Sequence, residues 1–205
     1  LGLGGMKLKI SALVIFAHLA SGLLFAFSST AVRATVITSI PDGTVIPMPA
    51  VNYQPYDYRG GQQTFGDPSI TWSTQHSHSV FGWTLGYGFG SNGYWDSNLV
   101  MAGAASDMTF AFSVPVNAVG GFINFAPGPQ KIAVYDTAHN LIESYDPNLY
   151  VGGTRANFTD SGFFIGFSES TPIAYFELTG TFIGITTLTI SAVPEASTWA
   201  MIIIG

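Results

Sequence analysis

Two histidines separated by one residue, His76 and His78, have the clearest metal-binding spacing in this 205-residue chain. On an extended strand, side chains two positions apart point to the same side, so both imidazoles would share one face. Such a pair can hold a metal ion if carboxylates join it, and Asp96 or Asp107 could supply one. The alternative, which we favour, is a solvated polar edge near a loop. We therefore expect no metal and no cofactor, with His76 and His78 as the candidate ligands if a metal binds.

A stretch rich in aromatic residues and glycine, residues 81–96, suggests a different chemistry. Exposed aromatic faces flanked by Asn and Asp are suited to stacking on sugar rings and bonding their hydroxyl groups. In the alternative interpretation, which we favour, Phe81, Trp83 and Leu85 alternate into the core and the rest forms a glycine-rich turn. If a glycan binds here, the candidate binding residues are Tyr87, Asn92, Tyr94, Trp95 and Asp96.

Motifs for covalent or phosphate chemistry are missing from the sequence. There is no Gly-x-Ser-x-Gly or Ser-x-x-Lys pattern, and the glycines of residues 86–90 are not followed by a lysine. The chain also contains no cysteine, which excludes thiol catalysis and cysteine-ligated zinc or iron–sulfur centres. We expect a protein that is not an enzyme, with a metal-dependent hydrolase built on the two histidines as the less favoured alternative.

The charge of the chain limits its partners. The formal net charge is −6, and half of the six basic residues precede residue 35. The part from Thr35 onward therefore carries −9, a charge that repels nucleic acid and anionic lipid headgroups. We expect no nucleic-acid partner. Its remaining cations are Arg59, Lys131 and Arg155.

The N-terminal residues have the pattern of a secretory signal peptide. A short basic segment, Met6–Lys9, precedes the apolar run 10–27, and small residues follow it. Val32 and Ala34 are placed for cleavage between Ala34 and Thr35. We expect Met6 to be the start, residues 1–34 to comprise upstream residues plus the signal peptide, and the rest to be exported. The alternative is a retained N-terminal anchor helix.

The C-terminal residues combine an extended segment with the beginning of an apolar helix. Pro194 disfavours helix in Val193, Glu195 resists entering hydrocarbon, and Trp199 prefers a membrane interface. The apolar residues 200–204 are fewer than the roughly 20 that span a bilayer. We therefore expect a transient inner-membrane helix that continues beyond Gly205.

This tail resembles the PEP-CTERM sorting signal of Gram-negative bacteria, whose usual form is Val-Pro-Glu-Pro, small hydroxylated residues, Trp or Leu, and a membrane helix. The matching positions are Val193, Pro194, Glu195, Ser197, Thr198 and Trp199, while Ala196 replaces the second proline. The resemblance implies processing by the membrane protease-transpeptidase exosortase, with delivery to the cell surface or the exopolysaccharide matrix. An ordinary membrane anchor is the alternative.

The same kind of tail is also labelled an ice-binding protein C-terminal region. Ice binding needs a flat, regular Thr-rich face, and only Thr186, Thr187 and Thr189 suggest one. We therefore do not expect ice binding.

The region between the two signals reads as one all-β domain, residues 35–191, followed by the sorting signal, residues 192–205. Short runs of β-branched and aromatic residues are separated by Gly, Pro, Asn or Asp, and several alternate with period two. Many short strands at this spacing predict a two-sheet β-sandwich, of jelly-roll type. The predicted strands are Thr35–Ile40, Ser69–Ser73, Val80–Leu85, Asn98–Met101, Met108–Val114, Ala118–Phe125, Lys131–Tyr135, Leu141–Tyr145, Gly162–Phe167, Ile173–Leu178 and Ile185–Ser191.

Two further features complete the domain. Residues 41–68 contain five prolines and predict a long irregular excursion, whereas residues 136–140 predict a hairpin loop with Asp and Asn as turn formers. The segments 112–122, 132–136, 163–168 and 172–176 resemble the β-sandwich body common in PEP-CTERM proteins. That body often ends with an acidic pair in its final strand, but residues 185–188 contain no acid.

Overall fold

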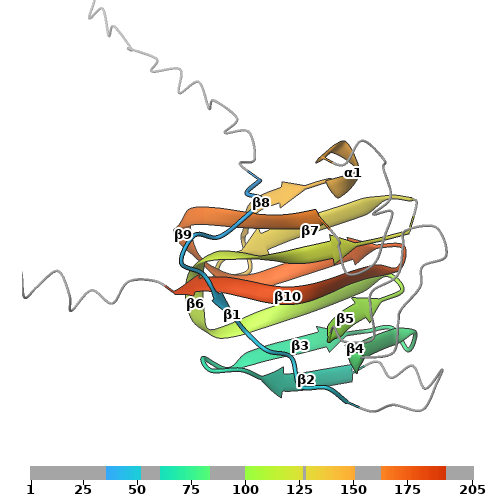
Figure 1. The fold of residues 1–205 in the computed structure, drawn as a ribbon. Helices are drawn as coiled ribbons and strands as arrows, with labels where there is room; N and C mark the ends of the chain where they lie inside the picture. Colours follow the sequence, from blue (N-terminus) through green and yellow to red (C-terminus); the bar gives the residue numbers. More distant parts are fainter. Residues whose placement is uncertain (1–35, 52–60, 84–99, 127, 151–162, 193–205) are drawn as a thin grey trace, which may run out of the picture. The chain divides into compact units, whose positions relative to one another are not determined.

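The computed structural model describes residues 36–51, 61–83, 100–126, 128–150 and 163–192, and these form antiparallel strands with one short helix (Figure 1). The all-β fold predicted from the sequence is therefore confirmed. The elements are β1 Thr44–Val45, β2 Gly61–Phe65, β3 Ile70–Thr74, β4 Ser79–Trp83, β5 Met101–Ala104, β6 Asp107–Asn124, β7 Gln130–Tyr135, β8 Leu141–Tyr145, α1 Pro147–Tyr150, β9 Phe163–Gly180 and β10 Ile183–Ala192.

Two long strands, β6 and β9, organise the fold because each runs through both layers of the structure (Figure 1). Residues 107–111 of β6 pair with 175–179 of β9, and residues 118–123 pair with 163–168. Between these two ladders the register shifts, and Pro115 and Pro172 lie at the interruption. Because proline cannot donate a ladder hydrogen bond, this is where the two-stranded ribbon can bend.

The ribbon divides the strands into two layers. In the first layer the order is β2-β3-β6-β9-β7-β8, using the first half of β6 and the second half of β9. In the second layer the order is β4-β5-β10-β6-β9, using the other halves, and β1 also pairs with β10. The long ribbon is shared by both layers of this β-sandwich.

The core lies between the layers and is rich in aromatic side chains. Phe81 of the second layer lies 5.0 Å from Phe65 and 5.2 Å from Trp72 of the first, measured between ring centroids. Phe167 and Phe176 lie on the two halves of β9 and therefore in different layers. Their ring centroids are 6.3 Å apart. The burial of Phe81 and of Trp83 agrees with the core interpretation of the aromatic stretch.

Alternation along β9 was predicted correctly for most of its second half. Phe176 and Leu178 are fully buried, whereas Tyr175 and Glu177 are partly exposed on the outer side. The exception is Ile173, which by alternation shares a face with Tyr175 and Glu177 but is fully buried. It lies at the bend of the ribbon, where the register shifts and the two faces are no longer distinct.

The structure corrects several predicted boundaries. The predicted pairs of strands at 108–125 and at 162–178 are each one continuous strand, and β5 begins only at Met101. In the described part of 35–40, Ile37 makes only an isolated bridge to Gly166. The excursion 41–68 contains β1 and β2, which the sequence did not indicate. Four of the five β2 residues are exposed, so this strand has no alternation of apolar and polar residues.

Candidate functional site

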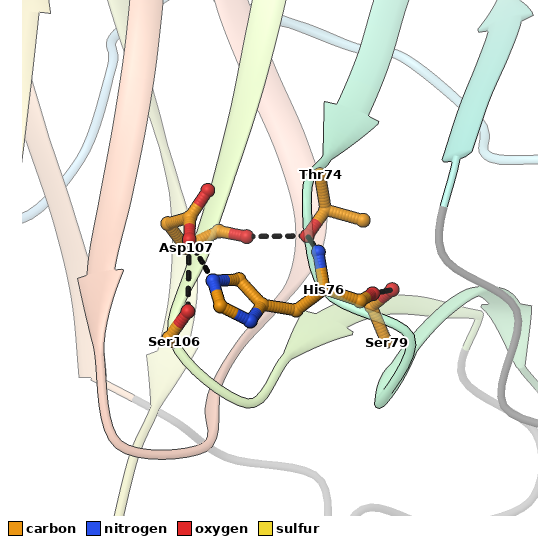
Figure 2. A network of polar contacts seen from close by, with 5 residues as sticks. All are labelled: Thr74, His76, Ser79, Ser106 and Asp107. Atoms are coloured by element: carbon orange, nitrogen blue, oxygen red, sulfur yellow. Dashed lines mark hydrogen bonds and ion pairs between the residues drawn. The ribbon is translucent and has the colours of Figure 1, made fainter.

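The His76 prediction leads to a polar cluster where the turn after β3 meets the start of β6 (Figure 2). His76 Nε2 lies 2.8 Å from Asp107 Oδ1, and Ser106 Oγ donates a hydrogen bond of 2.8 Å to the same oxygen. The Thr74 hydroxyl donates to the Asp107 carbonyl at 2.7 Å and accepts from the His76 backbone N–H at 3.2 Å. The cluster therefore ties a turn to a strand more than thirty residues away in the sequence.

The cluster does not have the arrangement of the metal site that was the less favoured interpretation of the two histidines. Residues 75–78 form a turn instead of a strand, so the two histidines are not held on one strand face. Among the residues that the structure describes, no group of three or more His, Cys, Asp or Glu side chains could hold a metal ion. Asp96, the other proposed ligand, lies outside those residues. His76 does contact Asp107, but His78 does not complete a metal-binding group with them.

The order of groups in this cluster also differs from a nucleophilic triad. In such a triad the histidine lies between the hydroxyl and the carboxylate, so that it can accept the hydroxyl proton. Here Asp107 lies between Ser106 and His76, and both contact its Oδ1 atom. The side chains of His76 and Asp107 are 50% and 38% exposed, so their contact is a solvated polar contact.

A second cluster, on the outer side of the first layer, was not found from the sequence. The His139 ring stacks on Tyr135 at a centroid distance of 4.8 Å and meets Tyr175 edge to face at 4.7 Å. Its Nε2 atom lies 3.3 Å from Glu177 Oε1, and Lys131 Nζ lies 3.5 Å from the Tyr135 hydroxyl oxygen. The alternation that places Tyr175 and Glu177 on one face of a strand was the only sequence signal for this cluster.

The hairpin loop between β7 and β8 holds His139 over the tyrosines, and the predicted turn formers are confirmed. Asp136 Oδ1 accepts hydrogen bonds from the backbone N–H groups of Ala138 and Asn140, at 2.9 and 2.8 Å. The Asn140 side chain donates to Asp136 Oδ2 at 2.9 Å, and this bond is the main cause of the lowered pKa of Asp136. His139 takes a left-handed backbone conformation, with φ of 61°. The loop thus fixes both the position and the direction of the imidazole.

Two glutamates form a third group near the edge strand β8. Glu143 is the ladder partner of the buried Val134, so it points toward the space between the layers. Its carboxyl group is hydrogen-bonded to that of Glu169, at the bend of β9. Among the described residues, Oε1 of each carboxyl group is buried without a hydrogen-bond partner. Burial, and then the hydrogen bond and negative charge of Glu143, raise the pKa of Glu169 from 4.5 to about 7.

Glu169→Gln should stabilise the protein at pH 8 by about 1 kcal/mol and have little effect at pH 4.5. The folded-state pKa is raised, so stability falls as pH rises from 4.5 to 7 and then stays at the lower level. The whole pKa shift, converted to free energy, would correspond to about 3 kcal/mol of unfolding free energy. The expected gain is smaller because Glu169 is partly exposed and solvent screens its repulsion with Glu143. Urea unfolding at both pH values measures the difference. The control Glu177→Gln, on the outer side, should gain no stability at pH 8, and equal effects of Glu169→Gln at both pH values would contradict the prediction.

Comparisons with known proteins give no identification. No protein-family model, curated protein or solved structure matches this chain. Its own residues are therefore the only guide to its function.

The remaining predicted site residues fall outside the part that the structure describes. This applies to the candidate cleavage site Ala34 and Thr35 and to the tail residues 193–199. It also applies to the glycan candidates Tyr87, Asn92, Tyr94, Trp95 and Asp96. In the described ranges, the structure contains no helix with the length and apolar character needed to cross a membrane.

The threonines that could suggest an ice-binding face are placed by the structure. Thr186 and Thr189 are 1% and 6% exposed, and both belong to β10 in the middle of the second layer. Thr187 is partly exposed and has a positive φ of 55°, at a register shift between β10 and β6. These three residues therefore do not form a flat exposed row.

Proposed function

We propose that this chain is an exported protein of the cell surface or exopolysaccharide matrix, sorted by exosortase and acting without catalysis. The observation that carries the proposal is the tail Val193–Trp199, which matches the PEP-CTERM signal in order at six of its seven positions. The signal-peptide pattern of residues 6–34 supports it independently, because a sorting signal outside the cytoplasm requires export first.

The composition of the domain supports the same proposal. Charged residues make up only 9% of the chain, whereas glycine and aromatic residues are frequent. The described surface strands carry mainly Thr, Ser, Gln and Tyr on the outer side of the first layer. A neutral, polar β surface of this kind suits a protein that remains among polysaccharides or at a cell surface.

The double variant Pro194→Ala/Glu195→Ala should abolish processing while keeping membrane targeting. Removing the helix break and the charge lets the apolar helix extend backward, so the protease loses its extended, charged recognition segment. The full gene is expressed in hosts with and without exosortase. Immunoblots of membrane and surface fractions should show unprocessed precursor in the inner membrane for the variant and mature protein at the surface for the wild type.

Ala196→Pro is the matched control, because it brings the tail to the usual form of the signal. This variant should be processed at least as completely as the wild type. Equal release of the wild type and the Pro194→Ala/Glu195→Ala variant to the surface would refute sorting by this tail. The same size and location of the wild type in both hosts would refute the role of exosortase.

A carbohydrate-binding module is the second candidate function. It is favoured by the combination of aromatic rings with Asn and Asp in residues 81–96, which the sequence alone provides. The residues that would bind, among them Tyr94 and Trp95, lie outside the described part of the chain. Affinity electrophoresis of the purified chain, with and without the double change Tyr94→Ala/Trp95→Ala, tests this candidate.

A further inference from the structure

We propose that the outer face of the first layer binds an uncharged polysaccharide, with Tyr135, Tyr175 and His139 as the end that stacks on sugar rings. This inference concerns the folded domain and does not depend on how the protein is exported. The face consists of two adjacent cross-strand rows: Thr64, Thr71, Ala111, Tyr175 and Tyr135 in one, and Gln62, Ser73, Thr109, Glu177 and Ala133 in the other.

The register of the strands places these side chains on one side. Directly opposed residues in neighbouring antiparallel strands point to the same face. The contact of 3.3 Å between the hydroxyl groups of Thr64 and Thr71 agrees with this. Five strands at the usual spacing make each row about 19 Å long. A row of this length can contact several units of a sugar chain.

The aromatic end of the face is held in place by several contacts. His139 is fixed by the stack on Tyr135, the edge contact with Tyr175 and the polar contact of 3.3 Å with Glu177 Oε1. Its side chain is nevertheless 56% exposed. A non-glycine residue in the left-handed region is uncommon and often marks a functional position. A glycine would fit this left-handed position without strain. The loop instead has a histidine there, and its imidazole lies at the surface against two tyrosines.

The neighbours of the aromatic end are small. Ala111 is the partner of Tyr175 on one side, and Ala133 is the partner of Glu177 on the other. Since alanine carries only a methyl group, both neighbours add little bulk beside Tyr175 and Glu177, and Ala133 is itself buried. The Glu177 side chain is 23% exposed. It can accept hydrogen bonds from sugar hydroxyl groups, and the threonines and serines farther along both rows can donate or accept them.

The charges on the face favour an uncharged polymer. Lys131 is balanced by Glu177, Asp107 adds a further carboxylate at the end of the face, and the whole chain carries −6. A nucleic acid or an acidic polysaccharide would be repelled. A peptide strand would need a free sheet edge for backbone hydrogen bonds, but the aromatic end of this face lies on β9 and β7, which are paired on both sides.

Affinity electrophoresis of the purified chain in gels containing xyloglucan, galactomannan or mixed-linkage β-glucan tests the proposal. At least one polymer should retard the wild type. Tyr175→Ala should weaken that binding about two- to tenfold, because a stacking contact is lost. Tyr175→Phe keeps the ring and should retain most of the binding. Phe182→Ala, which removes an exposed ring at the β9–β10 turn, is the control and should bind like the wild type.

Two results would overturn the proposal. One is the absence of retardation by all three polymers when thermal unfolding shows that the protein is folded. The other is retardation that Tyr175→Ala leaves unchanged and Tyr94→Ala/Trp95→Ala abolishes, which would assign the glycan to residues 81–96. The measurement uses purified protein without exosortase, so its outcome is independent of the sorting proposal.

Discussion

Replacing Phe176 by alanine should lower the free energy of unfolding by about 3–5 kcal/mol, the range for truncating a buried phenylalanine. Phe176 is fully buried in β9, and its ring lies 6.3 Å from both Phe110 and Phe167. Its ring therefore contacts Phe110 in its own layer and Phe167 in the facing layer. Truncation to alanine would leave a cavity and remove both contacts. Since domains of this size are stable by only about 5–15 kcal/mol, such a loss is severe. Urea unfolding followed by near-UV circular dichroism measures it.

The adjacent residue provides the control for this experiment. Tyr175 is on the same strand and has nearly the same volume, but its side chain points outward and is partly exposed. Tyr175→Ala should cost less than about 1 kcal/mol, as is usual for surface substitutions. Similar losses for both variants would contradict the two-layer arrangement, because that arrangement assigns opposite sides to the two rings.

Gly166→Val should destabilise the protein by about 2–3 kcal/mol, because it forces bulk into a close contact between strands. Gly166 of β9 is the ladder partner of Gly120 of β6. A Cβ atom at Gly166 would lie 2.7 Å from the Val119 carbonyl oxygen and 3.0 Å from Gly120 Cα, so the backbone would have to move. Gly166 also exchanges two backbone hydrogen bonds of 3.0 Å with Ile37, and its displacement would weaken both.

Ser168→Val is the matched control, two residues farther along β9 and on the same side of the strand. Ser168 is exposed, so the same β-branched side chain should change stability there by no more than about 0.5 kcal/mol. Thermal unfolding of the two variants compares them directly. A Gly166→Val protein as stable as the Ser168→Val protein would mean that β6 and β9 do not approach as closely as described.

The hairpin loop and the alternating strands were predictable because their signals are local. Asp136 and Asn140 form the turn through their own side chains, within five residues of chain. Alternation placed Phe176 and Leu178 on one face and Tyr175 and Glu177 on the other, since side-chain direction in a strand depends only on position along it, and the structure shows that the first of these faces is the buried one. The prediction of an all-β sandwich followed from many such segments.

The edge strand β2 and the continuous strands β6 and β9 could not be recognised in this way. Only Phe65 of β2 is buried, so its strand structure comes from hydrogen bonds to β3 and leaves no apolar pattern. Pro115 and Pro172 were interpreted as breaks between strands. The chain continues through both, because the ribbon bends there and passes from one layer to the other.

The sequence by itself determined the absence of cysteine chemistry, the acidic charge and the β character of the domain, and it contains the terminal patterns on which the sorting proposal rests. These depend on composition and on residues adjacent in the chain. Only the tertiary structure brought His76 to Asp107, Glu143 to Glu169, and His139 to Tyr175 and Glu177. Each of these contacts joins residues that are far apart in the sequence. They are decided by strand order and register, which depend on packing between distant segments and have no local sequence signal.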